Sequence, residues 1–150
     1  MTGPPPSILL VDDDEDDILL TRRAFERMRL GNPLHVAQNG EEAIAYLAGT
    51  GAFADRAKHP LPTLVLLDVK MPRKGGHEVL EWLKGQPKLK RIPVVMLTSS
   101  KDPSDVNRAY DLGVNSYLVK PLSFDGMNEI DRTLNLYWIM TNAAPDVAVK

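Results

Sequence analysis

Acidic side chains that could bind a metal ion stand directly after an apolar run near the start of the chain. Residues 12–17 are all acidic, and they follow the apolar residues 8–11. Four consecutive apolar residues are typical of a strand buried on both faces, and open α/β folds bind ligands beyond the carboxyl ends of such strands. Like charges gathered there need a positive partner, and Mg²⁺ is the usual one because it takes oxygen ligands. This reasoning assigns metal binding to Asp12 and Asp13. Residues 14–17 are explained by a helix start, where acidic side chains offset the macrodipole and one can cap.

Three later apolar runs also end in polar side chains. Asp68 follows the third run, Thr98 follows the fourth and Lys120 follows the fifth. Because the carboxyl ends of parallel strands share one edge of a sheet, we expect these side chains to gather beside Asp12 and Asp13. One carboxylate at a strand end is common, whereas this combination of acids, a hydroxyl and an ammonium is much more specific.

The chemistry that these residues suggest is phosphoryl transfer onto a carboxylate. Aspartate is a nucleophile that forms aspartyl-phosphates, and catalysis of such transfers consists mainly of positioning and charge neutralisation. A Mg²⁺ ion held by Asp13 and Asp68 would allow an anionic nucleophile to meet an anionic phosphate. Lys120 would supply a mobile point charge for a phosphate oxygen, and the Thr98 hydroxyl a hydrogen bond that forms only when the phosphoryl group is present.

The elements that must position these residues alternate regularly along the chain. Helical patterns separate five expected strands: Ser7–Val11, Leu34–Val36, Leu64–Leu67, Val94–Leu97 and Ser116–Val119. Gly113 is expected to close the fourth helix, and Ser123 to cap the fifth. Strict alternation predicts a parallel sheet with helices on both faces, and right-handed crossovers restrict it to a doubly wound α/β sheet.

Length and composition indicate one ordinary globular domain. The 150 residues, with net charge −2 and an isoelectric point of about 5.9, suit a single domain over 1–150 with its core at about 7–140. The charge gives no electrostatic case for nucleic acid. There is no cysteine, no signal-peptide pattern and no apolar run near the length of a membrane span. We therefore expect a cytoplasmic protein without a membrane segment, and no room for a second domain after Met140.

The complete motif set resembles one known family. The segments that carry the resemblance are Val11-Asp12-Asp13, Asp68 with Met71-Pro72, Thr98-Ser99 and Lys120-Pro121. They stand where the receiver domains (CheY-like) of two-component response regulators have their motifs, and the resemblance runs from Ile8 to Ile139. We accordingly expect the flavodoxin-like (βα)5 fold with strand order 2-1-3-4-5.

The resemblance also implies roles for individual residues. Asp68 would accept a phosphoryl group from a sensor histidine kinase, so the protein would assist its own phosphorylation and dephosphorylation without being an enzyme. Asp13, Asp68 and the backbone carbonyl of Lys70 would bind Mg²⁺ directly, with Asp12 as a water-mediated or alternate ligand. A lysine at position 70 is the basis of a hypothesis that the lifetime of the phosphate is altered.

A switch pair and a dimer are further expectations. Thr98 and Tyr117 would be the switch residues, although Tyr117 would also suit the core because aromatic residues favour strands. Residues 134–140 carry more apolar side chains than one core-facing stripe needs. This predicts a twofold homodimer through the fourth helix, fifth strand and fifth helix, or packing of these residues under the N-terminal segment.

A narrower resemblance concerns the signalling partner. The segments 61–76 and 112–121, together with the long connection 49–62, look like the single-domain regulators partnered with bacterial and cyanobacterial phytochromes. The connection itself could contact a partner or be a tolerated insertion. The downstream partner would be an unidentified protein or phosphotransfer protein.

Other functions on the same fold remain as alternatives. A Mg²⁺-dependent phosphatase would need a second acid soon after its nucleophile, but Val69 and Lys70 follow Asp68. A cofactor module that binds flavin would need a hydroxyl- and glycine-rich loop after the first strand, where this chain has carboxylates. A receiver that never accepts phosphate is disfavoured because the site residues are all present.

Overall fold

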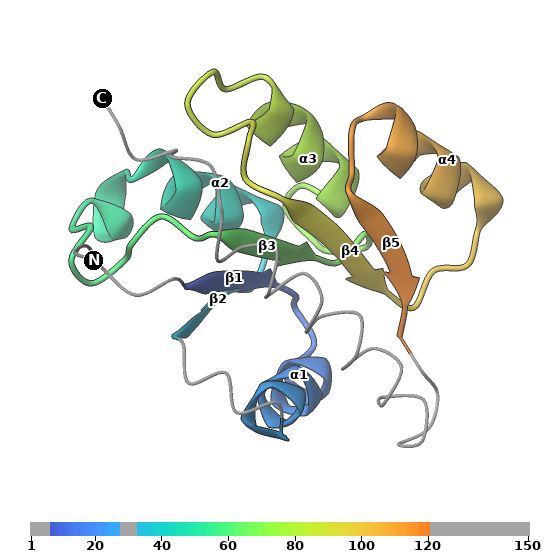
Figure 1. Cartoon of the computed structure of the whole chain (residues 1–150), viewed down its shortest axis with the longest axis horizontal. Helices are drawn as coiled ribbons and strands as arrows, with labels where there is room; N and C mark the ends of the chain where they lie inside the picture. Colours follow the sequence, from blue (N-terminus) through green and yellow to red (C-terminus); the bar gives the residue numbers. More distant parts are fainter. Residues whose placement is uncertain (1–6, 28–32, 121–150) are drawn as a thin grey trace.

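The structure, a computed structural model, describes residues 7–27 and 33–120, and it contains a parallel five-stranded sheet with strand order β2-β1-β3-β4-β5 (Figure 1). The strands are β1 (Ile8–Val11), β2 (Leu34–Ala37), β3 (Leu64–Leu67), β4 (Val94–Thr98) and β5 (Ser116–Val119). The helices are α1 (Glu15–Arg27), α2 (Gly40–Ala48), the short 3₁₀ helix η1 (Gly51–Phe53), α3 (Gly76–Lys84) and α4 (Pro103–Asp111). The predicted fold and strand order are confirmed.

The strand predictions agree with the structure to within one residue. β3 and β5 have the predicted bounds, whereas β4 includes Thr98 and β2 includes Ala37. Gly113 follows the α4 cap residue Leu112 in a left-handed conformation (φ 97°), which accounts for its place at the helix end. The predicted fifth helix, with its cap at Ser123, lies outside the described residues.

Helices cover both faces of the sheet. Figure 1 shows α1 on one side, with α2 and α3 on the other and α4 beside β5. The core under α1 includes Ile18 and Phe25 packed on Leu10 and Leu66. The opposite core includes α2, α3 and α4 side chains against β1, β3 and β4. Both faces of the central strands are therefore buried, as their uninterrupted apolar sequences require.

The register of the strands brings their carboxyl ends together. Val11 pairs with Leu67, and the next residue continues this ladder, because the Asp68 N–H donates to the Val11 carbonyl at 3.0 Å. Between β4 and β5, the Lys120 N–H likewise donates to the Thr98 carbonyl at 2.7 Å. The polar residues at the ends of these strands consequently lie at the same edge of the sheet, the edge formed by the carboxyl ends of the strands.

The connection 49–62 is packed against α2. The Tyr46 hydroxyl donates to the Pro60 carbonyl at 2.9 Å, and the Tyr46 ring contacts the rings of Phe53 and His59. The Arg56 guanidinium donates to the carbonyls of Tyr46 and Leu47 at 2.8 Å each, which caps the end of α2. The segment is thus part of the domain's packing, while its contact with a partner stays a prediction.

Within the described ranges, no helix is long and apolar enough to cross a membrane.

Candidate functional site

Three carboxylates lie together at the carboxyl edge of the sheet. Oxygens of Asp12, Asp13 and Asp68 lie within 4.8 Å of one another. Asp12 and Asp68 are buried, at 1% and 8% exposure, whereas Asp13 is exposed. Oxygen donors of this kind, reachable from solvent on one side, fit a hard divalent cation such as Mg²⁺. The site therefore contains the three carboxylates that the sequence predicts, whereas the predicted role of the Lys70 carbonyl stays a prediction.

The acidic run continues into the first turn of α1, as predicted. Asp14 Oδ1 accepts hydrogen bonds from the backbone N–H groups of Asp16 and Asp17, at 2.9 and 3.2 Å, so Asp14 caps the helix. The Asp14 N–H in turn donates to Asp12 Oδ1 at 3.0 Å. This chain of bonds fixes the helix start relative to the buried carboxylate.

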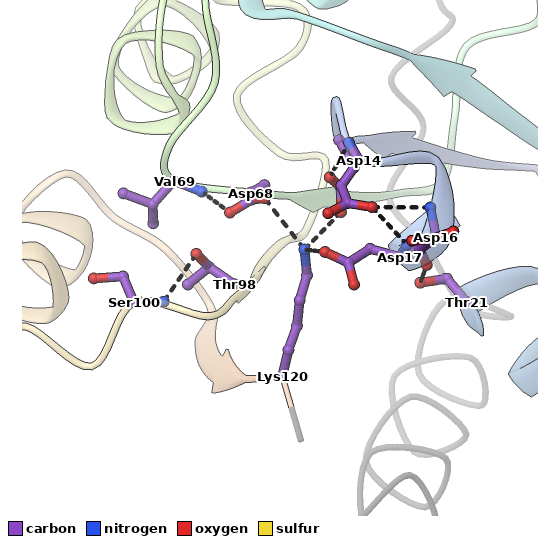
Figure 2. Close-up of polar contacts among 10 residues, drawn as sticks. Asp14, Asp16, Asp17, Thr21, Asp68, Val69, Thr98, Ser100 and Lys120 are labelled. Carbon is purple, nitrogen blue, oxygen red and sulfur yellow. Dashed lines mark hydrogen bonds and ion pairs between the residues drawn. The ribbon is translucent and has the colours of Figure 1, made fainter. Parts of the chain in front are cut away.

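Lys120 joins the carboxylates from the end of β5. Figure 2 shows its ammonium among acidic side chains, and the Nζ atom lies 2.7 Å from Asp12 Oδ2, 2.9 Å from Asp17 Oδ2 and 3.2 Å from Asp68 Oδ2. Burial alone would lower the pKa of Lys120, but the hydrogen bonds to Asp12 and Asp17 and the charge of Asp68 outweigh burial and raise it. The ammonium therefore remains charged over the whole physiological range.

Burial dominates at Asp12. It raises the pKa of the carboxyl, against the opposing effects of the Lys120 ammonium and the Asp14 N–H. The neighbouring charge of Asp68 raises the pKa of Asp12 further. The ionised form of Asp12 thus depends on a positive neighbour, which is Lys120 in this structure.

Asp68 is held by the start of the loop after β3. Its Oδ1 accepts from the Val69 N–H at 2.7 Å, which leaves Oδ2 facing Lys120. Gly76, at the start of α3, lies so close that a Cβ atom there would be 2.1 Å from the Asp68 carbonyl oxygen. Gly76 is needed for this approach because only a residue without a side chain can pack here.

The same loop has an unusual backbone at its tip. Arg73 and Lys74 both have positive φ, 50° and 75°, a region that L-residues other than glycine, asparagine and aspartate seldom adopt. The Arg73 carbonyl accepts from the Glu41 N–H at 2.9 Å, at the start of α2. The loop after Asp68 is thus bound to α2 at its tip, and it leads into α3 at its end.

A hydrogen-bonded network connects Thr98 to Tyr117 through Ser100. Thr98 Oγ1 accepts from the Ser100 N–H at 3.3 Å, and the Tyr117 hydroxyl donates to the Ser100 carbonyl at 2.9 Å. The Ser100 hydroxyl donates to Asp105 Oδ2 at 2.6 Å, on α4. Burial raises the pKa of Tyr117 against the opposing effect of its hydrogen bond to Ser100. Buried His77 on α3 has its Nε2 2.8 Å from the Asp105 carbonyl oxygen, which ties α3 to α4.

The structure brings most of the predicted site residues together. Asp12, Asp13, Asp68 and Lys120 share one cluster, and Thr98 stands beside them at the end of β4. Tyr117 is not in this cluster, but its hydroxyl donates to the Ser100 carbonyl in the loop after β4. The Lys70 side chain is exposed, and the predicted role concerns its backbone carbonyl. The roles of these residues in metal binding, phosphorylation and switching stay predictions.

Sequence reasoning missed one member of the cluster. It explained Asp17 by the helix start alone, but the Asp17 carboxylate also contacts Lys120. No spacing signal pointed to this contact, because α1 begins at Glu15 and its acidic first turn is fully explained by the helix start.

With this geometry established, comparison with known proteins identifies the family. The family model of the response regulator receiver domain matches residues 8–130. The chain belongs to this family. This receiver domain has similar relatives in both archaea and bacteria. The probable methanogenesis regulatory protein FilR2 of Methanothrix harundinacea is 39% identical over 129 residues, which cover 86% of this chain and 81% of FilR2. Response regulator Rcp1 of Synechocystis sp. is 35% identical over 126 residues, which cover 84% of each chain.

Solved structures agree with both the fold and the family. The phosphorylated cyanobacterial phytochrome response regulator RcpA matches this receiver domain with a TM-score of 0.82 and 36% identity, over 91% of this chain and 95% of RcpA. The Mn²⁺-bound form of Rcp1 matches with a TM-score of 0.84 and 35% identity, over 94% and 99%. The resemblance to phytochrome response regulators that the sequence indicates is thus confirmed at the level of similarity.

Proposed function

We propose that this protein is a single-domain response regulator that accepts a phosphoryl group on Asp68 from a sensor histidine kinase. The observation that carries the proposal is the position of the Asp68 carboxylate. The carboxylate follows directly after the central strand β3, lies 3.2 Å from the Lys120 ammonium, and groups with the Asp12 and Asp13 carboxylates. A carboxylate nucleophile flanked by an ammonium and a divalent-cation site is what phosphoryl transfer onto aspartate requires.

Mg²⁺ is the cofactor in this proposal. Asp13, Asp68 and the Lys70 backbone carbonyl would hold the ion, with Asp12 as a direct or water-mediated ligand. When bound, the ion neutralises charge so that an anionic phosphate can approach an anionic carboxylate. The Mn²⁺-bound form of Rcp1 supports a divalent cation in this family. The Val69 N–H donates to Asp68 Oδ1, so Oδ2 would be the oxygen that attacks the phosphate in this proposal.

The proposed response to phosphorylation is a rearrangement of Thr98 and Tyr117. Both contact the backbone of Ser100, Thr98 by accepting from its N–H and Tyr117 by donating to its carbonyl. A Thr98 hydroxyl that turns to a phosphoryl oxygen would give up the first bond, and the loop carrying Ser100 could then release the second. The loop leads directly into α4, so the change would reach that surface.

The proposed output is a change in protein contacts, in the cytoplasm and without enzymatic activity. Exposed Tyr110 on α4 and Val119 on β5 support a twofold homodimer through α4, β5 and the helix predicted after Ser123. Sedimentation of the full chain, with and without beryllofluoride, tests the dimer. A monomer at high concentration in both conditions would refute it.

A phytochrome is the proposed kinase. The support is the similarity to RcpA, to Rcp1 and to a regulator described in red light signalling of R. palustris, which is 33% identical with a TM-score of 0.85. FilR2, whose name concerns methanogenesis, is similarly close in sequence. Phosphotransfer from a purified phytochrome kinase, compared with a histidine kinase of another pathway, decides between these partners.

Intact mass after treatment with acetyl phosphate tests phosphorylation itself. Wild type should gain one phosphoryl mass with Mg²⁺ and none with EDTA, and Asp68→Asn should gain none in either condition. Because a short-lived phosphate would escape detection, beryllofluoride binding to wild type serves as the control. If wild type shows no phosphoryl adduct and also does not bind beryllofluoride, the proposal is contradicted.

A further inference from the structure

Asp17 is a third carboxylate partner of Lys120, and it has no role in the proposed phosphorylation. It lies in the first turn of α1, and its backbone is fixed by the Asp14 cap on one side and by a 2.9 Å hydrogen bond from the Thr21 hydroxyl to its carbonyl on the other. Its side chain is 31% exposed, and its Oδ2 lies 2.9 Å from Lys120 Nζ (Figure 2). The helix start thus presents this carboxylate to the ammonium from the solvent side.

The ammonium has no spare hydrogen for another partner. It has three donors, and three carboxylate oxygens stand within 3.2 Å of Nζ, from Asp12, Asp17 and Asp68. Two of these partners, Asp12 and Asp68, are also members of the carboxylate group that fits a divalent cation. Lys120 and a cation therefore compete for the same two side chains.

Asp17 is the partner that the cation does not need. It is outside the group of carboxylates whose oxygens lie within 4.8 Å of one another. It is also the most exposed of the three partners of Lys120, at 31% against 1% and 10%. An ammonium that gives up Asp12 and Asp68 to a cation can keep one charged hydrogen bond through Asp17, without leaving the site.

We propose that Asp17 is a positioning residue that holds the Lys120 ammonium beside the site when a divalent cation occupies the Asp12, Asp13 and Asp68 carboxylates. The inference rests on the metal site of the proposed function. Without Asp17, Asp12 and Asp68 are the only carboxylate partners of the ammonium among those described, and an incoming cation must displace it into water. Asp17 thus lowers the competition between two positive groups that phosphorylation requires at the same time.

Asp16 provides a matched control for the charge of Asp17. Both are acidic residues of the first helical turn, and both backbone N–H groups donate to Asp14. Asp16 is exposed and is not among the carboxylates that contact Lys120. Asp16→Asn therefore removes the same charge and the same helix-dipole contribution as Asp17→Asn, but leaves the ion pair intact.

The affinity for Mn²⁺, measured from the EPR signal of the free ion with full-length protein, is the first readout. We expect Asp17→Asn to weaken Mn²⁺ binding about two- to fivefold relative to Asp16→Asn, the range of a partly exposed ion pair. Asp17→Glu, which retains the carboxylate, should bind Mn²⁺ within a factor of two of wild type. Urea denaturation without metal checks that all variants are folded.

NMR of the Lys120 ammonium separates positioning from a simple effect of charge. Couplings across hydrogen bonds, from the Lys120 ¹⁵Nζ to carboxylate carbons, identify its partners with and without Mg²⁺. We expect the coupling to Asp17 to persist with Mg²⁺ while those to Asp12 and Asp68 weaken. Loss of the Asp17 coupling on addition of Mg²⁺, or equal Mn²⁺ affinities of Asp17→Asn and Asp16→Asn, would overturn this inference alone. No metal binding by wild type would overturn the proposed metal site with it.

Discussion

Replacing Lys120 with methionine should destabilise the folded protein strongly when no divalent cation is present. The change preserves most of the apolar stem but removes the charge that neutralises three carboxylates. Breaking a buried ion pair from one side costs about 3–5 kcal/mol, because a charge is left buried without a partner. Two of the three partners are buried, at 1% and 10% side-chain exposure, and the third is 31% exposed.

Hydrogen bonds that remain after the substitution make the expected loss of stability smaller than this. Asp12 keeps a hydrogen bond from the Asp14 N–H, and Asp68 keeps one from the Val69 N–H. The exposed third partner contributes only about 0–1 kcal/mol. We therefore expect a loss of about 2–4 kcal/mol in the free energy of unfolding at neutral pH. Because a cation can replace the ammonium, saturating Mg²⁺ should recover most of this loss.

The pH dependence of the Lys120→Met deficit has a definite sign. Burial already raises the pKa of Asp12, and loss of the ammonium raises it further. A carboxyl whose pKa is higher in the folded state favours folding below its unfolded pKa of about 4, and this contribution is lost as pH rises through the folded value. The deficit should hence be small in acid and grow toward neutral pH.

Urea denaturation with EDTA measures the deficit, with Lys101→Met as the matched control. Lys101 is exposed in the loop before α4, so its replacement should change stability by less than about 0.5 kcal/mol. If Lys120→Met is as stable as Lys101→Met without metal at neutral pH, the ammonium does not neutralise the cluster and the electrostatic reasoning fails.

Three further predictions concern a glycine beside Asp68 and two contacts between α2 and the connection 49–62. Gly76→Ala should destabilise the protein by about 1–3 kcal/mol, because its Cβ would stand 2.1 Å from the Asp68 carbonyl oxygen. Gly85→Ala, with nothing closer than 3.4 Å, should be neutral or slightly stabilising, and equal urea midpoints for the two would contradict this reading. Burial raises the pKa of Tyr46 to about 12, so its contribution to stability is complete below pH of about 10 and is lost as pH rises toward 12. Tyrosinate absorbance of wild type minus Tyr46→Phe should show this late titration, and an ordinary midpoint would refute it. Arg56→Met should cost about 1–3 kcal/mol by removing charged hydrogen bonds to the last carbonyls of α2, and an unchanged thermal midpoint would show that the cap is dispensable.

The strands and the acidic cluster were predictable because local and topological signals agree. Uninterrupted apolar runs such as 64–67 are typical of a central parallel strand, and the regular alternation with helices makes the residue after each run emerge at the same edge. This places Asp12, Asp68 and Lys120 together although more than 100 residues separate the first from the last. No pairwise contact had to be known for that conclusion.

The remaining features depend on side-chain directions that no sequence pattern specifies. An acidic residue in the first turn of a helix is already explained by the helix dipole, so nothing in the sequence indicated that Asp17 also contacts Lys120. The Tyr117 hydroxyl donates to the Ser100 carbonyl, a contact set by the path of the loop after β4. In the long connection, Arg56 turns back onto the α2 carbonyls, which a reading of the segment as polar and irregular could not indicate.

Chemical trapping tests whether Asp68 carries the phosphoryl group. Borohydride reduces an aspartyl-phosphate to homoserine, which peptide mass spectrometry locates in the sequence. After acetyl phosphate, Mg²⁺ and borohydride, we expect homoserine at Asp68 and at no other acidic residue. Homoserine at Asp12 or Asp13 instead, with Asp68 intact, would contradict it.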